Sequence, residues 1–178
     1  MNKLMTEVIL IGVGGHGKVV LDAVLSNPNT DIKIIGFLDD GDIKEIHGIK
    51  KIGNTKDFVN FKDKKFHIAL GNNKFREKIA KELGEEKLIS IIHKTAYISS
   101  MSKIGNGTYI GAMTVINPEC EIGKGCIINT GTVVEHNSYI GDYSHLSYRV
   151  LVGSESRIFS GTMIDMGRII ERNSEIKG

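Results

Sequence analysis

The stretch INTGTVVEHNSYIGDYSHLS, from Ile128 to Ser147, carries an aliphatic side chain at every sixth position. The same spacing extends along the second half of the chain as an unbroken series: Ile92, Ile98, Ile104, Ile110, Ile116, Ile122, Ile128, Val134, Ile140, Leu146, Val152, Ile158, Ile164, Ile170 and Ile176. Neither the 3.6-residue period of a helix nor the alternation of a strand gives a strict period of six. A hexapeptide repeat does, because each six residues form one short strand and one corner of a β-helix. The spacing therefore predicts a left-handed parallel β-helix of roughly four to five turns over residues 91–178.

A small residue precedes most of these aliphatic positions by two. Because side chains alternate along a strand, both positions point into the solenoid and the residue between them points outward. Cys120 and Cys126 occupy the small inward position of successive hexads. We therefore interpret both as small buried hydrophobic side chains rather than as a nucleophile or a disulfide.

Three hexads make one turn, so residues eighteen apart stack and the outward positions divide into three faces. The first face is apolar throughout, with Tyr97, Val115, Val133, Leu151 and Ile169. The second is mostly charged, with Lys103, Glu121, Tyr139, Arg157 and Glu175, and the third is mixed, with Tyr109, Ile127, His145 and Met163. A continuous apolar outer face is what a buried subunit contact requires.

Residues 1–90 have a different rhythm, in which apolar strands alternate with helical patterns. We expect strands over residues 7–12, 32–40, 66–73 and 88–93, and helices after the first of them and over residues 74–84. Residues 41–65 give a weak signal, which we interpret as a loop and one short helix. Strands that alternate with helices predict a small Rossmann-like α/β domain with a parallel sheet.

Gly-Val-Gly-Gly-His-Gly, from Gly12 to Gly17, follows the first expected strand and opens a helix. Glycines at this spacing let backbone amides approach a phosphate at a helix N-terminus, and Asp39 ends the next strand, where a ribose-binding acid would lie. We favour a nucleotide or nucleotide sugar as the ligand. NAD and a purely structural tight turn are the alternatives. His16, within the loop, suits a ligand contact or a local cap better than a catalyst.

Composition narrows the function classes. The formal net charge of +2 gives no bias towards nucleic acid or a membrane surface. No apolar run approaches the length of a membrane span, and the N-terminal sequence lacks a signal-peptide pattern, so we expect a cytoplasmic protein.

The motifs GVGGHGKVV, FLDD, IALGNN and INTGTVVEHNSYIGDYSHLS, in this order, resemble the bacterial nucleotide-sugar acetyltransferases of the hexapeptide-repeat superfamily. Within that family they are similar to the N-acetyltransferases of UDP-4-amino-sugars in bacillosamine synthesis and to the sialic acid O-acetyltransferases. The resemblance implies a homotrimer of left-handed β-helices, with acetyl-CoA bound between neighbouring subunits, a nucleotide-sugar substrate and no metal. It covers nearly the whole chain.

The resemblance also implies roles for individual residues. His136 would be the general base and His145 would contact acetyl-CoA. The nucleotide sugar would be held by Gly14, Gly15, His16, Asp39, Asp40 and Gly71. Ser154 and Met166 would meet the CoA arm through their backbone groups.

Two features depart from the family pattern. An acid commonly follows the base directly, and here that residue is Asn137; Glu135 precedes His136 but should point elsewhere. The glycine that usually follows the aliphatic position is absent from the last hexads, and the sequence stops at Gly178 without a closing coil and proline-containing tail. We therefore expect either a shortened protein or weakened acetyl-CoA binding.

Three other functions are open to this sequence. A metal-dependent hydratase of the γ-carbonic anhydrase type uses the same solenoid but needs three histidine ligands, and only His136, His145 and His93 are candidates. A sugar-nucleotide-binding protein without transferase activity is the second. The third is O-acetylation of a sialic acid, because the motifs do not distinguish N- from O-acetylation.

Overall fold

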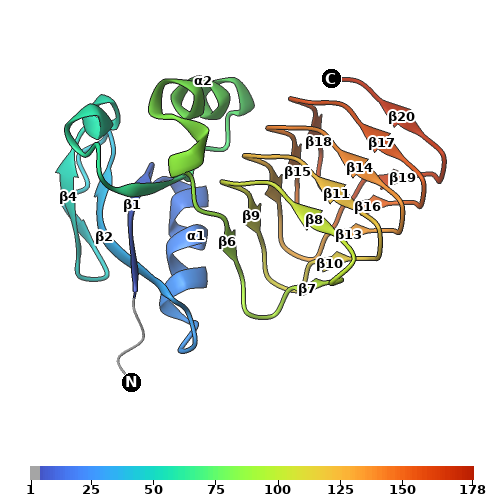
Figure 1. The fold of residues 1–178 in the computed structure, drawn as a ribbon, viewed down its shortest axis with the longest axis horizontal. Helices are drawn as coiled ribbons and strands as arrows, with labels where there is room; N and C mark the ends of the chain where they lie inside the picture. Colours follow the sequence, from blue (N-terminus) through green and yellow to red (C-terminus); the bar gives the residue numbers. More distant parts are fainter. Residues whose placement is uncertain (1–4) are drawn as a thin grey trace.

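The computed structural model describes residues 5–178, so the first four residues of the expected 1–90 domain lie outside the described part. An α/β unit with a mixed sheet stands beside a solenoid of short stacked strands (Figure 1). The sheet contains β1 (Thr6–Ile11), β2 (Ile32–Leu38), β3 (Glu45–Ile46), β4 (Ile49–Gly53) and β5 (Lys65–Ile68), in the order β3-β4-β2-β1-β5. All neighbours in it are parallel except β3 and β4.

The helices follow the expected signals. α1 (Gly15–Leu25) starts in the glycine loop and ends at Ser26. α2 (Asn73–Leu83) is capped by Asn72, whose side chain accepts a hydrogen bond from the Phe75 amide at 3.0 Å. It stops at Gly84, whose φ of 95° few other residues adopt. Two short 3₁₀ helices, η1 (Thr55–Asn60) and η2 (Glu85–Lys87), complete the unit.

Two expectations for this unit were wrong. Residues 88–93 do not form a fourth strand of the sheet: Leu88 makes one bridge to Phe66, and β6 (Ile91–Ile92) pairs with the solenoid instead. The six-residue register already begins at Ile92, and this register decides the pairing. The hairpin of β3 and β4 was missed within residues 41–65, because both strands are short and carry several charged side chains.

The solenoid has five coils, and each coil contributes one strand to each of three parallel sheets. The first sheet holds β6, β9 (Tyr109–Ile110), β12 (Ile127–Ile128), β15 (His145–Leu146) and β18 (Met163–Ile164). The second holds β7 (Tyr97–Ile98), β10 (Val115–Ile116), β13 (Val133–Val134), β16 (Leu151–Val152) and β19 (Ile169–Ile170). The third holds β8 (Lys103–Ile104), β11 (Glu121–Ile122), β14 (Tyr139–Ile140), β17 (Arg157–Ile158) and β20 (Glu175–Ile176).

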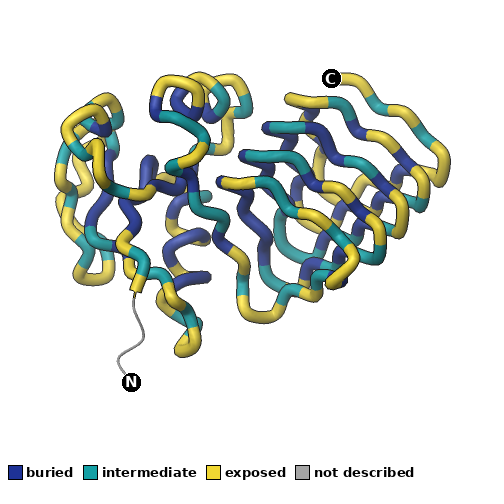
Figure 2. Tube along the Cα trace, viewed as in Figure 1, coloured by how far each residue is buried: buried dark blue, intermediate teal, exposed yellow. Residues whose placement is uncertain are grey.

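The predicted inward and outward positions are confirmed. The sixth-position aliphatic residues from Ile110 to Ile170 form one buried cluster with Cys120 and Cys126, shown in dark blue along the coils in Figure 2. Nearer the two ends of the solenoid, Ile98, Ile104 and Ile176 are partly buried, and Ile92 is exposed. Burial raises the pKa of the Cys126 thiol to about 12, so the thiolate is disfavoured. Strand pairing in register stacks residues eighteen apart, as expected for this β-helix architecture.

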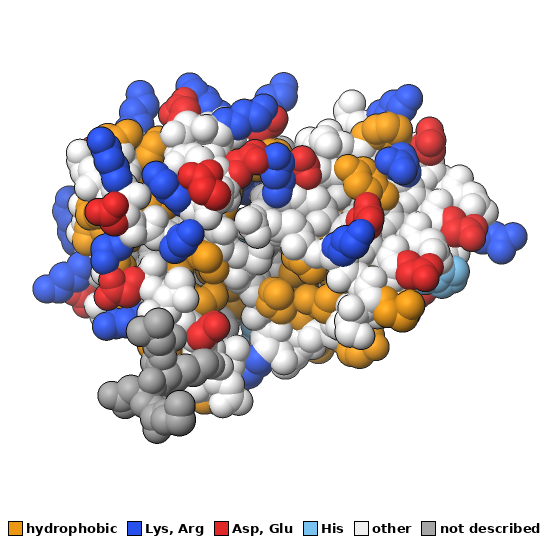
Figure 3. Space-filling model, in the orientation of Figure 1, with side chains coloured by type: hydrophobic (Ala, Val, Ile, Leu, Met, Phe, Trp, Pro, Cys, Tyr) orange, Lys and Arg blue, Asp and Glu red, His pale blue; other side chains and the backbone are white. Residues whose placement is uncertain are grey.

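The three outward faces have different surroundings. The mixed face of β6, β9 and β12 packs onto the α/β unit, where Tyr109 and Ile127 join the core of Val8, Leu10 and Val20. The apolar face of β7, β10, β13, β16 and β19 is left open, with Tyr97 59% and Ile169 65% exposed. Figure 3 shows hydrophobic side chains gathered on the lower side of the solenoid, over β7 and β10. We call this surface the apolar face.

Candidate functional site

The glycine loop contains two kinds of glycine. Gly12 has a φ of 94°, and a Cβ at Gly17 would collide with the carbonyl oxygen of Gly12, so the fold itself requires both. A Cβ at Gly14 or Gly15 would meet nothing within 4 Å. Both of these glycines are exposed at the start of α1. The open space over Gly14 and Gly15 is therefore available to a ligand at the helix N-terminus.

The two acids after β2 shape the same edge of the sheet. Asp39 accepts hydrogen bonds from the amides of Val13 and Gly41, both at 2.8 Å, so its carboxylate holds the glycine loop in place. Asp40 accepts from the Thr55 amide at 2.8 Å. Asp40 also lines a pocket of about 660 Å³ at the carboxyl ends of the strands, where open α/β sheets bind ligands. The other residues that line this pocket include Lys56, Phe58, Gly71, Asn72, Phe75 and Lys78.

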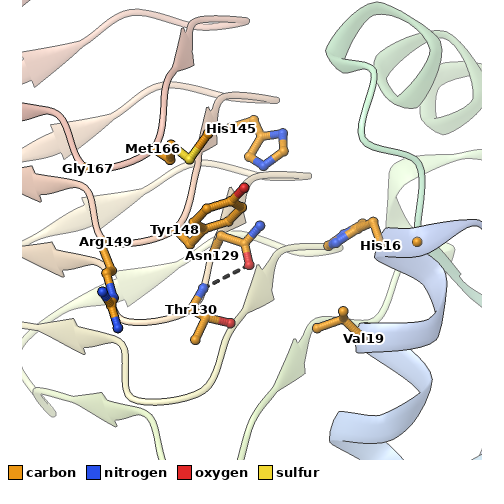
Figure 4. A pocket seen from close by; sticks show the side chains of 10 residues that line it. His16, Val19, Asn129, Thr130, His145, Tyr148, Arg149, Met166 and Gly167 are labelled. Carbon is orange, nitrogen blue, oxygen red and sulfur yellow. Dashed lines mark hydrogen bonds between the residues drawn. The ribbon is translucent and has the colours of Figure 1, made fainter.

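A cleft of about 740 Å³ lies between the α/β unit and the solenoid. From α1 it is lined by Gly15, His16 and Val19, and from the solenoid by Asn129, Thr130, His145, Tyr148, Arg149, Met166 and Gly167. In Figure 4, His16 and Val19 face the solenoid side chains across the opening. Two of the predicted sugar-binding residues and two of the predicted acetyl-CoA contacts thus share one cleft.

Behind the cleft, the rings of His16 and His67 lie beside Tyr109, and the ring of His145 lies beside that of His16. The His16 ring lies edge-on to Tyr109 with centroids 5.1 Å apart, and it lies 6.3 Å from the ring of His145. The His67 ring is 6.4 Å from that of Tyr109. The Nδ1 atoms of His67 and His145 are paired with the carbonyl oxygens of Ile89 (2.8 Å) and Gly71 (3.4 Å). We call His16, His67, His145 and Tyr109 the histidine cluster.

Burial keeps these imidazoles neutral. It lowers the pKa of His16 to about 3 and those of His67 and His145 to about 4, with the nearby Arg76 cation acting in the same direction. A carbonyl can only accept, so Nδ1 of His67 and of His145 carries the proton. Their Nε2 atoms are acceptors, buried without a partner in the described structure. His145 is therefore suited to contact a ligand in the cleft rather than to take up a proton near neutral pH.

His136 lies elsewhere. It is exposed on the corner between β13 and β14, at one edge of the apolar face, whereas the cleft opens at the other edge. Ser154 lies one coil further along the same corner, and Met166 lines the cleft. The structure of the chain therefore brings His16 and His145 together, but it does not bring His136 or Ser154 to them.

Arg76 joins the two parts of the molecule. The residue is 1% exposed, and its guanidinium donates to the carbonyl oxygens of Leu70, Gly125 and Tyr143 at 2.8, 2.6 and 2.9 Å. Burial lowers its pKa to about 10, which leaves it charged at neutral pH. The Arg76 guanidinium thus hydrogen-bonds to the backbone next to Gly71 and to the backbone just before the strand of His145.

Several lining residues were missed by the sequence analysis. Thr130, Tyr148 and Met166 are eighteen apart and stack on one corner, so Met166 alone would have indicated the other two. Arg76, His67 and Tyr109 belong to no motif, and their roles depend on how the two parts of the chain pack. Between residues 5 and 178 no group of three or more histidine, cysteine or acidic side chains is arranged to hold a metal ion. Neither helix in this range has the length and apolar character needed to cross a bilayer.

Two protein-family models match separate parts of the chain. Residues 7–83 match the PglD N-terminal domain, and residues 101–136 match the bacterial transferase hexapeptide (six repeats). In these two matches the chain resembles the nucleotide-sugar acetyltransferases that join such an N-terminal domain to a hexapeptide-repeat solenoid.

Two curated relatives are similar over about two thirds of the chain. An uncharacterized protein of Acanthamoeba polyphaga mimivirus is 36% identical over 117 residues, which are 65% of this chain and 23% of the relative. The UDP-N-acetylbacillosamine N-acetyltransferase of Bacillus subtilis is 36% identical over 116 residues, which are 61% of this chain and 52% of the enzyme. The chain thus spans about half, or less, of the length of these relatives.

Solved structures match nearly the whole chain. The acetyltransferase domain of PglB from Neisseria gonorrhoeae, in complex with acetyl coenzyme A, superposes with a TM-score of 0.72 and 28% identity, covering 96% of this chain and 87% of that one. A histidine variant of perosamine N-acetyltransferase from Caulobacter crescentus, in complex with CoA and GDP-perosamine, gives a TM-score of 0.70 and 25% identity, covering 96% and 88%.

Proposed function

We propose that this protein transfers an acetyl group from acetyl-CoA to the amine of a nucleotide-linked amino sugar, with His136 as the general base. The favoured substrate is a UDP-4-amino-4,6-dideoxy sugar, a proposal supported by the similarity to the Bacillus subtilis enzyme. GDP-perosamine in the structure of the Caulobacter crescentus relative supports a nucleotide sugar as the class of substrate.

The main observation that supports this proposal is the cleft between the α/β unit and the solenoid. Its α1 side offers open glycine backbone at a helix N-terminus, which suits the phosphates of a nucleotide sugar. The neighbouring pocket beside Asp40 and Gly71 extends along the carboxyl edge of the sheet and suits the nucleotide. On the solenoid side, His145 and Met166 face the same space. A sugar held from α1 would therefore present its amine towards a thioester held on the solenoid.

A homotrimer would complete the site. In a closed three-fold ring the contact is heterologous, so one edge of the apolar face meets the other edge of the next subunit. His136 and Ser154 lie at one edge, and the cleft with Met166 opens at the other. Association through Tyr97, Val133 and the rest of the apolar face would bring His136 of one subunit to the cleft of its neighbour.

The proposed chemistry is direct transfer. The sugar nitrogen attacks the thioester carbonyl, the C–N bond forms, and the proton lost by the nitrogen passes to Nε2 of His136. Collapse of the tetrahedral intermediate breaks the C–S bond, and that proton neutralises the departing thiolate. The buried thiols of Cys120 and Cys126 do not suit an acyl-enzyme route.

The test is turnover of acetyl-CoA by the purified chain against a panel of UDP-4-amino-sugars, GDP-amino-sugars and sialic acids, read as release of free thiol. We expect turnover with a nucleotide-linked amino sugar. Turnover with sialic acids alone would favour O-acetylation, and nucleotide-sugar binding without thiol release would favour a binding protein. Calorimetry with NAD checks the alternative ligand of the glycine loop.

A further inference from the structure

Three side chains on the His136 corner form a hydrogen-bonded chain. Nδ1 of His136 is paired with Oδ1 of Asn137 at 2.8 Å, and Nδ2 of Asn137 donates to Oε2 of Glu119. Glu119 and Asn137 are eighteen residues apart, so they occupy the same corner position in successive coils. Both have left-handed backbone, with φ of 61° and 59°, and the Asn137 amide donates to the Pro118 carbonyl oxygen at 3.1 Å. The coil stacking therefore holds the two side chains against each other.

The chemistry of these groups determines which atom donates and which accepts in each of the two hydrogen bonds. A carboxylate only accepts hydrogen bonds, so the NH₂ group of Asn137 must face Glu119. The amide oxygen then faces the imidazole, and because this oxygen only accepts, Nδ1 of His136 carries the proton. The neutral ring consequently presents an unprotonated Nε2, the atom that a general base needs.

We propose that Glu119 is a positioning residue for the reaction, which acts through Asn137 to fix the tautomer of His136. This inference rests on the proposed function of His136 as the base. The resemblance to acetyltransferases leads one to expect an acid directly after the base, and here Asn137 takes that position. Glu119 supplies the missing carboxylate from the preceding coil, with the amide of Asn137 between the charge and the ring.

The other nearby carboxylates, those of Glu135 and Glu155, do not hydrogen-bond to Asn137 in the described residues. Glu135 precedes His136, but its Oε2 accepts from Nδ2 of Asn117 at 3.0 Å. Glu155 occupies the next coil of the same column, with a similar φ of 60°, and within residues 5–178 its carboxylate has no hydrogen bond to Asn137. Glu155 is thus a matched control for loss of a charge at this corner.

The kinetic test replaces Glu119 by glutamine, which can present either an amide NH₂ or an oxygen to Asn137. Asn137 is then free to turn its NH₂ towards the ring, which favours the tautomer with the proton on Nε2. We expect Glu119→Gln to lower kcat about 10- to 100-fold, with little change in the KM of either substrate. Glu155→Gln should retain the wild-type kcat.

A rescue variant separates this role from a structural one. In Glu119→Gln/Asn137→Asp, the new carboxylate can accept from Nδ1 without a partner in the preceding coil. We therefore expect the double variant to recover kcat relative to Glu119→Gln alone. Unchanged kcat in Glu119→Gln, or failure of the added Asn137→Asp substitution to rescue a lowered kcat, overturns the inference.

The tautomer itself gives a readout that does not need activity. In protein with ¹⁵N-labelled histidine, the His136 ring nitrogens are assigned by their loss in His136→Ala, and their shifts report which nitrogen carries the proton. We expect Nδ1–H in the wild type and a mixture in Glu119→Gln. If the wild type transfers no acetyl group to any sugar, the proposed function fails, and this spectrum still decides the inference. An identical tautomer in both proteins overturns it.

Discussion

Nε of Arg76, in the α/β unit, donates a hydrogen bond of 2.6 Å to the carbonyl oxygen of Gly125, in the solenoid. No carboxylate accompanies this cation within residues 5–178: its other acceptors are the carbonyl oxygens of Leu70, Gly71, Tyr143 and Ser144 and the side chain of Asn73. A planar guanidinium with five donors can satisfy backbone from both units at once. Arg76 therefore stabilises the packing on which the cleft depends.

Arg76→Met should destabilise the protein by about 3 kcal/mol or more, because several buried carbonyl oxygens lose their donor. Lysine at this position should recover less than half of the loss, since a single ammonium cannot reach both units. Urea unfolding measures the difference. Lys78→Met on the exposed side of α2 is the matched control and should change stability by less than about 0.5 kcal/mol. Equal midpoints for the two methionine variants would contradict this role of Arg76.

The solenoid could be predicted almost residue by residue, because a period of six leaves a single register. All fifteen aliphatic positions, from Ile92 to Ile176, lie in the strands expected for them. The apolar face and the burial of both cysteines follow from the same period. In the α/β unit, the glycine loop and α2 were recognised by their turn and cap residues, which are local signals.

The interdomain features could not be predicted in this way. The hexad register indicates that His145 points out of the solenoid, but not that it faces His16. In the sequence, Arg76 is one of several charged residues of a basic helix, and nothing there indicates that the solenoid packs against it. The bond between Glu119 and Asn137 depends on side-chain geometry between coils. His16 and Arg76 contact partners in the other unit, which no periodicity indicates. The eighteen-residue period stacks Asn137 on Glu119 but does not show which of their side-chain atoms meet.

The histidine cluster should make stability depend on pH. The pKa of buried His67 is about 4, below its ordinary value of 6.5, so the unfolded chain binds a proton that the folded chain does not. The contribution of neutral His67 to the free energy of unfolding is therefore present above about pH 6.5 and is lost as the pH decreases towards 4. His67 alone should contribute a loss of about 2 kcal/mol between pH 6.5 and pH 5.

Denaturant unfolding at a series of pH values measures this loss. His67→Asn should flatten the decline, because asparagine does not titrate. His47→Asn, in the exposed turn between β3 and β4, is the control and should keep the wild-type slope. A wild-type stability that stays constant from pH 7 to pH 5 would argue against the neutral cluster.

The glycine loop gives a test of nucleotide-sugar binding that spares the fold. Gly15→Val adds a side chain where the protein itself leaves open space, so the thermal midpoint should change little. The same side chain should block approach of phosphates to α1 and weaken nucleotide-sugar binding at least about tenfold. Calorimetry measures the affinity. Unchanged binding of UDP-sugars by the folded variant would place the phosphates elsewhere.

The apolar face predicts the assembly. Val133→Glu puts a charge in the centre of the proposed subunit contact, where burial without a partner costs several kcal/mol in each of three copies. Light scattering should show a trimer for the wild type and monomers for this variant. Tyr139→Glu introduces the same residue on the charged face of the same coil, where Arg157 can pair with it, and should stay trimeric. A wild-type monomer at micromolar concentration would refute the prediction.

His136 is the residue on which the proposed chemistry depends. His136→Ala should lower kcat by about 10²- to 10⁴-fold, the usual contribution of a general base, while nucleotide-sugar affinity changes little because the sugar is held from α1. His47→Asn, a histidine far from the cleft, should keep wild-type turnover. Asn137→Asp should move the acid limb of the pH–rate profile to higher pH, since a carboxylate beside the ring stabilises the imidazolium more than an amide does. Steady-state turnover of the His136→Ala trimer is the deciding measurement: a wild-type kcat would mean that another group takes the proton.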